Sequence, residues 1–300
     1  MSKGPSVVIT DRDRDREAWL RARRTGIGGS DVAAICGLSR WRQPLDVWLQ
    51  KLDLLPPTEE SEAMRWGHAL EEPIRKEVAR RLDLMVVPDH ALYRATAPTW
   101  ALASPDAIVG DYVGVGEWKL VGARQVGTWE EGPPLEAELQ ARWYMLVLGY
   151  GVAWIAGLLG GTELAIHQVE RDAEVEGLLL ERAEAFWRLV VDRTPPVVVG
   201  TQEERDALRE AFPALEGEAP VPLDEEAQRW LLRRAMAILD RREAEQRQLQ
   251  AENEIRLALQ GARAGSIDGR VVIELRAHEV AEHTVAAHTV ERWWTPRGKE

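Results

Sequence analysis

The sequence predicts an α/β (α+β) fold in which a mixed central sheet is flanked by helices and followed by a mainly helical C-terminal appendage. Helical patterns precede a group of short strands, a further helix separates two pairs of strands, and the last part of the chain is dense in helix formers. Elements in this order bury a sheet between helices. We divide the chain into a core of residues 1–196, a linker of residues 197–222 and an arm of residues 223–300.

The helices of the core come first. Residues 17–24 carry a helical pattern into a glycine-rich turn, and Ser30 or Asp31 can cap the helix that follows it. Residues 44–52 predict another short helix. The strongest helical pattern covers residues 65–82, where apolar side chains recur every four residues at Leu70, Ile74, Val78 and Leu82.

The strands of the core follow these helices. Residues 85–93 and 101–109 predict two strands, and Gly110-Asp111 predicts a turn. In residues 112–121 apolar residues alternate with Gly, Glu and Lys, as in a half-buried strand. The turn therefore joins residues 101–109 and 112–121 into a hairpin.

The remaining elements complete the sheet and add the arm. Residues 136–148 and 173–192 predict helices, and residues 152–159 and 164–169 predict paired strands. Residues 223–260 predict a helical arm whose leucines do not keep a strict heptad, so we expect no long coiled coil. Residues 266–275 predict a turn and a strand.

The composition excludes several classes of protein. The 300 residues contain no apolar run long enough to span a membrane, and residues 1–16 are too charged for a secretory signal peptide. The single cysteine, Cys36, excludes an iron–sulfur cluster or a zinc ribbon held by cysteines. We therefore expect no membrane association, no iron–sulfur cluster and a cytoplasmic location.

The net charge of -12 argues, taken alone, against binding to nucleic acid. Local clusters of charge matter more than the sum, however. Arginines gather ahead of the glycine-rich turn, at positions 12, 14, 16, 21, 23 and 24. A surface that is acidic overall can therefore still contain a basic channel.

Two acids and a lysine meet in the predicted hairpin. Residues i and i+2 of a strand share a face, so Glu117 and Lys119 point the same way and Trp118 the other way. The hairpin can bring Asp106 beside them. Two close carboxylates repel each other unless a cation lies between them, and oxygen ligands with open positions suit Mg²⁺ or Mn²⁺. A surface hairpin with a simple ion pair is the alternative.

Pro105-Asp106 and Glu117-x-Lys119 resemble the signature of the PD-(D/E)xK nuclease superfamily. Residues 24–31, 66–72 and 138–149 supply further motifs in matching order. Together these segments resemble the YqaJ-like viral recombinase and phage lambda-type exonuclease family over residues 15–195. The resemblance implies a restriction-endonuclease-like core.

The resemblance also implies a metal site for Mg²⁺ or Mn²⁺. Asp106 and Glu117 would be its first ligands, and Glu71 the third, because the family places a helix glutamate four residues after a glycine, here Gly67. The main-chain carbonyl of Trp118 would be a further ligand.

The other implied site residues act on water and phosphate. Lys119 would activate the water or stabilise developing charge, and Gln140 holds the first position of the family's catalytic Gln-x-Gln motif. Arg142 replaces the second glutamine, and it would contact the scissile phosphate or repel Lys119. Arg24 and Ser30 would hold the 5′-terminal phosphate.

The expected function is therefore a Mg²⁺-dependent exonuclease that degrades one strand of linear duplex DNA from its 5′ end. The exposed 3′ strand would pass to a single-strand annealing protein in a bacterium or a phage-infected host cell, and the family implies a ring-shaped homo-oligomer. Two alternatives stay open: a restriction- or repair-type endonuclease, and a catalytically weak protein that binds DNA ends.

The tail contains His278, His283 and His288, five residues apart, followed by Trp293-Trp294. This spacing distributes the imidazoles over different faces of a helix or strand, which disfavours a shared metal site. The paired tryptophans would pack in a small terminal hairpin, which we expect, or stack on bases.

Overall fold

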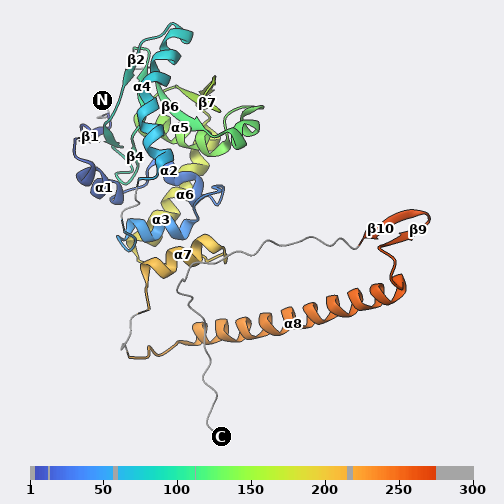
Figure 1. Ribbon diagram of the computed structural model, residues 1–300. Helices are drawn as coiled ribbons and strands as arrows, with labels where there is room; N and C mark the ends of the chain where they lie inside the picture. Colours follow the sequence, from blue (N-terminus) through green and yellow to red (C-terminus); the bar gives the residue numbers. More distant parts are fainter. Residues whose placement is uncertain (1–3, 13, 57–59, 112, 215–218, 275–300) are drawn as a thin grey trace. The chain divides into compact units, whose positions relative to one another are not determined.

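The computed structural model describes residues 4–12, 14–56, 60–111, 113–214 and 219–274. Its main sheet is mixed and has five strands (Figure 1). Contacts divide the chain into two units, Met1–Glu216 and Gly217–Glu300. The sheet lies in the first unit, and the fold class predicted from the sequence is confirmed.

The strand order of the sheet is β2-β5-β6-β7-β8. Its strands are β2 (Val86–Pro88), β5 (Ala107–Val109), β6 (Gly114–Val121), β7 (Val152–Leu159) and β8 (Glu163–Glu170). β6 and β7 are parallel over eight residue pairs, and the other neighbours are antiparallel. Parallel neighbours need a crossover connection, which here contains a short 3₁₀ helix, η1 (Ala123–Trp129), and α5 (Leu135–Leu148).

Helices cover both faces of the sheet (Figure 1). One face packs against α5 together with α2 (Gly29–Ile35), α3 (Pro44–Lys51) and α6 (Ala173–Val191). The other face packs against α4 (Glu62–Leu82) through Ile74 and Val78. β6 serves both cores because its side chains alternate: Val115 and Val121 are buried toward α5, and Trp118 is buried toward α4.

The predicted strands 85–93 and 101–109 are each divided in two. Their outer parts are β2 and β5, and their inner parts are β3 (Leu92–Arg94) and β4 (Leu102–Ala103), which form a second sheet with β1 (Ser6–Ile9). A main-chain hydrogen bond from Asp89 N to Asp106 O, 3.1 Å long, joins the chain where it passes between the two sheets. Asp106 therefore lies at a break between strands, close to α1 (Arg16–Arg24) and the N-terminal segment.

The predicted linker is ordered as far as α7 (Gln202–Ala211). Ala207 is buried against the main core, and the Glu204 carboxylate accepts hydrogen bonds from the N–H groups of Val199, Gly200 and Thr201. The first unit consequently extends to Glu216, beyond the boundary at residue 196 that the composition indicates.

The second unit contains α8 (Glu225–Leu259) and a hairpin of β9 (Ala264–Ile267) and β10 (Arg270–Glu274). Asp224 caps the N-terminus of α8, and no residue of this helix is buried. The turn and strand predicted over residues 266–275 correspond to the turn of this hairpin and β10, and β9 is the strand that was not predicted. The histidines and the paired tryptophans of the tail lie outside the described residues. No helix in the described part of the chain is long and apolar enough to cross a membrane.

Candidate active site

Asp106 is held against β6 by the main chain. Its N–H donates to Gly116 O at 3.0 Å, and its Oδ2 accepts from the N–H of Trp118 at 2.8 Å. Because the second donor is a backbone group, the position of the carboxylate depends on the register of the hairpin. The hairpin thus performs the task expected of it: it brings Asp106 beside the acid and lysine of the next strand.

Glu117 and Lys119 share a face of β6, as the alternation predicts. Lys119 Nζ donates to Glu117 Oε1 at 2.5 Å and to Gln140 Oε1 at 3.0 Å. Gln140 Nε2 in turn donates to the Tyr144 hydroxyl at 2.9 Å, one helical turn further along α5. The ammonium group of Lys119 is therefore fixed from both the strand and the helix.

Burial changes the ionisation of this group of residues. Glu117 is only 3% exposed, and its burial, together with the neighbouring Asp106, raises its pKa to about 8 despite the opposing charge of Lys119. Burial alone would lower the pKa of Lys119, but Glu117 and Asp106 outweigh it and raise that pKa above its ordinary value. The pocket therefore favours the ammonium form of Lys119 and disfavours ionisation of Glu117.

Arg12 reaches this pocket from the segment after β1. Its guanidinium forms an ion pair with Glu71 of α4, and its Nη1 lies 3.4 Å from Asp106 Oδ1. The side chain is 13% exposed. Glu71, Asp106, Glu117 and Lys119 line one pocket with Arg12, but no three Asp, Glu, His or Cys side chains of the described residues form a set that could hold a metal ion as they stand.

The donor chemistry of the pocket nevertheless fits a divalent cation. Glu117 Oε2 is buried with no hydrogen-bond partner, which is costly for a carboxylate oxygen. Asp106 shares the pocket, and carboxylate oxygens are the ligands that Mg²⁺ and Mn²⁺ prefer. Trp118 lines the same pocket, while its indole packs on the other face of the sheet with Ile74 and Val78. A cation here would satisfy the orphaned oxygen and reduce the repulsion between the acids.

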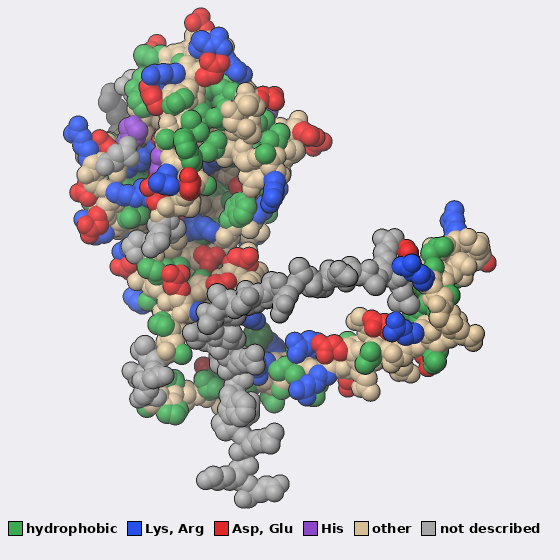
Figure 2. All heavy atoms as spheres, in the orientation of Figure 1, with side chains coloured by type: hydrophobic (Ala, Val, Ile, Leu, Met, Phe, Trp, Pro, Cys, Tyr) green, Lys and Arg blue, Asp and Glu red, His purple; other side chains and the backbone are tan. Residues whose placement is uncertain are grey.

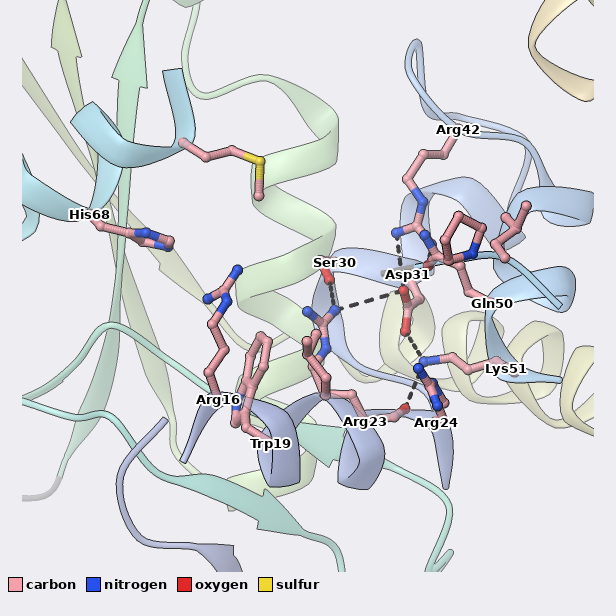
Figure 3. Close-up of a pocket in the computed structure, with 14 residues that line it drawn as sticks. Arg16, Trp19, Arg23, Arg24, Ser30, Asp31, Arg42, Gln50, Lys51 and His68 are labelled. Atoms are coloured by element: carbon pink, nitrogen blue, oxygen red, sulfur yellow. Dashed lines mark hydrogen bonds and ion pairs between the residues drawn. The ribbon is translucent and has the colours of Figure 1, made fainter. Parts of the chain in front are cut away.

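A second pocket, shown in Figure 3, is lined by cations. It adjoins the first, because Arg23 and Ser30 line both. The positively charged residues that line it are Arg16, Arg23, Arg24, Arg42 and Lys51. Arg23 Nη2 donates to Ser30 Oγ at 2.6 Å, whereas Arg24 Nη1 pairs with Asp53 Oδ2 at 2.6 Å. Of these two arginines, Arg23 lines both pockets and Arg24 lines only the cationic one. Arg23 is therefore the better placed of the two to act beside Ser30.

A buried acid organises the wall of the cationic pocket. Asp31 Oδ2 accepts from Lys51 Nζ at 2.6 Å, and its Oδ1 accepts from Arg42 Nη1 at 3.1 Å (Figure 3). Burial alone would raise the pKa of Asp31, but the cations hold it well below its ordinary value. Burial lowers the pKa of Lys51 to about 8. One carboxylate thus anchors several cations and leaves an excess of positive charge around Ser30.

Arg142 lies elsewhere. Its Nε donates to Glu138 Oε1 at 2.8 Å and its Nη1 donates to the main-chain oxygen of Glu170 at 3.0 Å. It lines neither the carboxylate pocket nor the cationic one. These contacts tie α5 to β8, and they keep the guanidinium from the Lys119 ammonium that it was expected to repel.

Comparison with known proteins identifies a family and a relative that the chain resembles. Residues 18–151 match the family model of the YqaJ-like viral recombinase domain. The uncharacterized protein YqaJ of Bacillus subtilis (strain 168) is 30% identical over 227 residues, which cover 74% of this chain and 71% of that protein. The chain belongs to the YqaJ-like viral recombinase family.

Solved structures share the fold of this YqaJ-like chain. LHK-Exo in complex with dAMP is 22% identical, with a TM-score of 0.51 over 59% of this chain and 94% of that chain. A second structure, described as an alkaline exonuclease (LHK-Exo) from Laribacter hongkongensis, matches with the same coverage and a TM-score of 0.50. The matched family region of residues 18–151 contains every site residue that the sequence predicts.

Three residues of the YqaJ-like site were missed by sequence reasoning. Tyr144 could have been found, because it lies one helical turn from Gln140. Arg23 could have been considered as an alternative to Arg24 for binding the terminal phosphate. Arg12 belongs to the arginine cluster of the sequence, but its contacts with Glu71 and Asp106 have no sequence signal, since they span 59 and 94 residues.

Proposed function

We propose that the protein is a Mg²⁺-dependent deoxyribonuclease, also served by Mn²⁺, that degrades one strand of linear duplex DNA from the 5′ end. The supporting observation is the junction of two pockets: one lined by three acids and a lysine, the other by five cations, with Ser30 lining both. This pair suits an enzyme that starts at a phosphorylated 5′ end, because one site would hydrolyse a phosphodiester and the other would bind the terminal phosphate.

The carboxylates have the role of holding the ion. Asp106 and Glu117 would bind it, with Glu71 and the main-chain carbonyl of Trp118 as further ligands. Bound Mg²⁺ supplies positive charge to the phosphate oxygens and to the departing 3′-oxygen. Lys119, fixed by Glu117 and Gln140, orients the attacking water and stabilises negative charge that develops on the phosphate.

The cationic pocket has the role of reading the 5′ phosphate. Arg23 and Ser30 are joined by a hydrogen bond, and Arg24 lies on the same wall. A guanidinium binds phosphate oxygens with two donors, so these arginines favour an end that carries phosphate. Local charge also answers the objection of the acidic total: blue and red side chains are interspersed over the face seen in Figure 2, whereas the pocket itself is rich in arginine.

The family supports further proposals about partners. A recombinase-type exonuclease leaves a 3′ single strand for an annealing protein, and a ring of identical subunits would keep the enzyme on its substrate. Both processes belong in the cytoplasm of a bacterium or a phage-infected host cell. Arg142, whose contacts lie within the fold, has no part in the proposed DNA contacts.

The direction and chemistry are tested with linear duplex labelled at either the 5′ or the 3′ end, in Mg²⁺ and in EDTA. The parent chain should release the 5′ label in Mg²⁺ alone, and Lys119→Ala should release none. Lys76→Ala, which removes an exposed lysine from α4, is the matched control and should cleave normally.

Two outcomes would favour the alternatives. Cutting of closed circular DNA would indicate an endonuclease. Binding to ends without release of nucleotides in Mg²⁺ or Mn²⁺ would indicate an end-binding protein.

The two arginines give a sharper prediction for end recognition. Arg23→Ala should abolish most of the preference for phosphorylated over hydroxyl 5′ ends, because Arg23 contacts Ser30 and faces both pockets. Arg24→Ala should have a smaller effect, since Arg24 is paired with Asp53. Initial cleavage rates on the two kinds of end measure the preference. An unchanged preference in both variants would remove the cationic pocket from end recognition.

A further inference from the structure

Trp41 is an exposed tryptophan beside the proposed catalytic pocket. It lies between α2 and α3 and is 67% exposed, whereas six other tryptophans are buried. Exposure leaves the aromatic face of Trp41 available to a ligand, and the position of the ring at a pocket shows which ligand could reach it.

The loop that carries Trp41 is firmly held. Ser39 Oγ accepts from the N–H of Trp41 at 3.1 Å and from the N–H of Arg42 at 3.3 Å. The N–H of Arg40 donates to Glu136 Oε1 of α5 at 2.7 Å. These bonds fix the backbone on both sides of the indole, although nothing buries the ring itself.

Arg42 fixes the far side of the same loop. Its Nη1 donates to buried Asp31 at 3.1 Å, and its Nη2 donates to Gln50 Oε1 at 2.6 Å (Figure 3). Trp41 is therefore presented by a preorganised loop, which lowers the entropic cost of binding a flat ligand against it.

Trp41 lines a third pocket that continues the catalytic one. This pocket shares Ser30, Lys119 and Gln140 with the pocket of the carboxylates, and the exposed Arg40 adds positive charge to its wall. The two residues of the Lys119–Gln140 hydrogen bond line both pockets, so the pockets meet at this bond. A DNA strand whose scissile phosphate lies at Lys119 must place its next nucleotide within reach of this pocket.

The chemistry of the pocket matches a nucleobase on a phosphate chain. Every base has an aromatic face that stacks on tryptophan, and the neighbouring arginine binds phosphate. With the terminal phosphate in the cationic pocket and the scissile phosphate at Lys119, the base that reaches Trp41 belongs to the second nucleotide. We propose that Trp41 stacks on the base of the second nucleotide of the strand being degraded, an inference that rests on the proposed function.

The test compares 5′-phosphorylated duplexes that are intact or abasic at the first, second or third nucleotide of that strand. Binding is measured in Ca²⁺, and the length of the strands is checked afterwards to verify that they were not cleaved. Trp41→Ala should weaken binding to intact duplex about 10-fold, as expected for one base–aromatic stack. Trp41→Phe should keep most of the affinity. An abasic second nucleotide should weaken the parent by a similar factor and weaken Trp41→Ala no further.

The matched control is Phe212→Ala, which removes another exposed aromatic side chain of the first unit, 57% exposed and outside the three pockets. It should bind every duplex like the parent. Two results would contradict the stacking proposal but leave the proposed function intact, provided that the parent binds and cleaves duplex. In the first, Trp41→Ala binds intact duplex as tightly as the parent does. In the second, Trp41→Ala lowers the affinity for the abasic duplex as much as the affinity for the intact one. If the parent neither binds nor cleaves linear duplex, the proposed function fails with it. If Trp41 instead binds a protein side chain, Trp41→Ala should bind intact duplex as tightly as the parent does.

Discussion

Glu117 is the residue at which folding and chemistry make opposite demands. Burial beside Asp106 raises its pKa to about 8, so the folded metal-free protein holds this carboxyl protonated over a range where the unfolded chain, with the ordinary pKa of 4.5, has ionised it. A metal ligand must be ionised. A bound cation would offset the free energy needed to ionise the buried Glu117 carboxyl.

The pH dependence of stability follows from this residue. Between the two pKa values the folded state binds the extra proton, so the free energy of unfolding of the metal-free protein should fall as pH rises from about 4.5 to about 8, by up to a few kcal/mol. Urea unfolding in EDTA across this range measures it. Glu117→Gln should flatten this part of the dependence, and an equally steep fall in that variant would assign it to other groups.

Arg12 supplies a positive charge to the acids of the pocket. Arg12→Gln would leave Glu71 and Asp106 without this partner, so the metal-free protein should lose about 1–3 kcal/mol of stability. Mg²⁺ should then stabilise the variant more than it stabilises the parent, because the ion no longer competes with the guanidinium.

Thermal unfolding with and without Mg²⁺ measures both effects. Arg14→Gln is the control, since Arg14 is 88% exposed and its ion pair with Asp11 should contribute less than about 1 kcal/mol. Equal increments from Mg²⁺ in parent and Arg12→Gln would show that Arg12 does not compete with the ion.

At the scale of elements, the close approach of α2 to α5 couples the two pockets. A Cβ at Gly29 would lie 2.6 Å from Tyr144 Cε1, closer than real Cβ atoms approach, and 3.0 Å from Gln140 O, which is a tight contact. Only a glycine lets α2 lie against the turn of α5 that positions Lys119. The helix proposed to bind phosphate, α2, is thus packed directly on the helix that carries Gln140, α5.

Gly29→Ala should therefore destabilise the protein by about 1–3 kcal/mol and slow cleavage, because α5 must shift and take Gln140 with it. Gly177→Ala in α6 is the matched control: a Cβ there meets nothing within 4 Å, so it should stabilise the helix by about 0.5–1 kcal/mol. Urea unfolding and cleavage rates report both. A neutral Gly29→Ala would mean that the two helices separate without loss.

The elements also show what sequence can and cannot predict. Alternation in β6 correctly places Glu117 and Lys119 together, because a two-residue period depends on local backbone geometry alone. Pro88-Asp89 marks the point at which residues 85–93 divide, but the sheet that each part joins has no local signal. Arg23 and Arg24 differ by one position on a helix, and the choice between them depends on tertiary packing: Arg23 lies 4.6 Å over the ring of Trp19, which orients it toward Ser30.

At the scale of the whole molecule, the two units differ in how they are stabilised. The first has a core on each face of its sheet, and α8 of the second has no buried residue. A protein of residues 1–216 should consequently fold alone, with an unfolding midpoint within about 4 °C of the full chain. It should also retain Mg²⁺-dependent cleavage of linear duplex.

Calorimetry and the end-label assay compare the shortened and full chains. A large fall in the midpoint would show that the second unit contributes to the core. A stable fragment that has lost cleavage would instead assign the second unit a part in gripping DNA or in assembly.

The bond from the N–H of Trp118 to Asp106 has a lasting consequence for how this protein can vary. No substitution of Trp118 by an ordinary amino acid other than proline removes this N–H donor. The choice of side chain at position 118 is therefore constrained by packing in the apolar layer beneath α4. Descendants of this chain can exchange the indole for other bulky hydrocarbon groups while the reacting geometry above it is inherited unchanged.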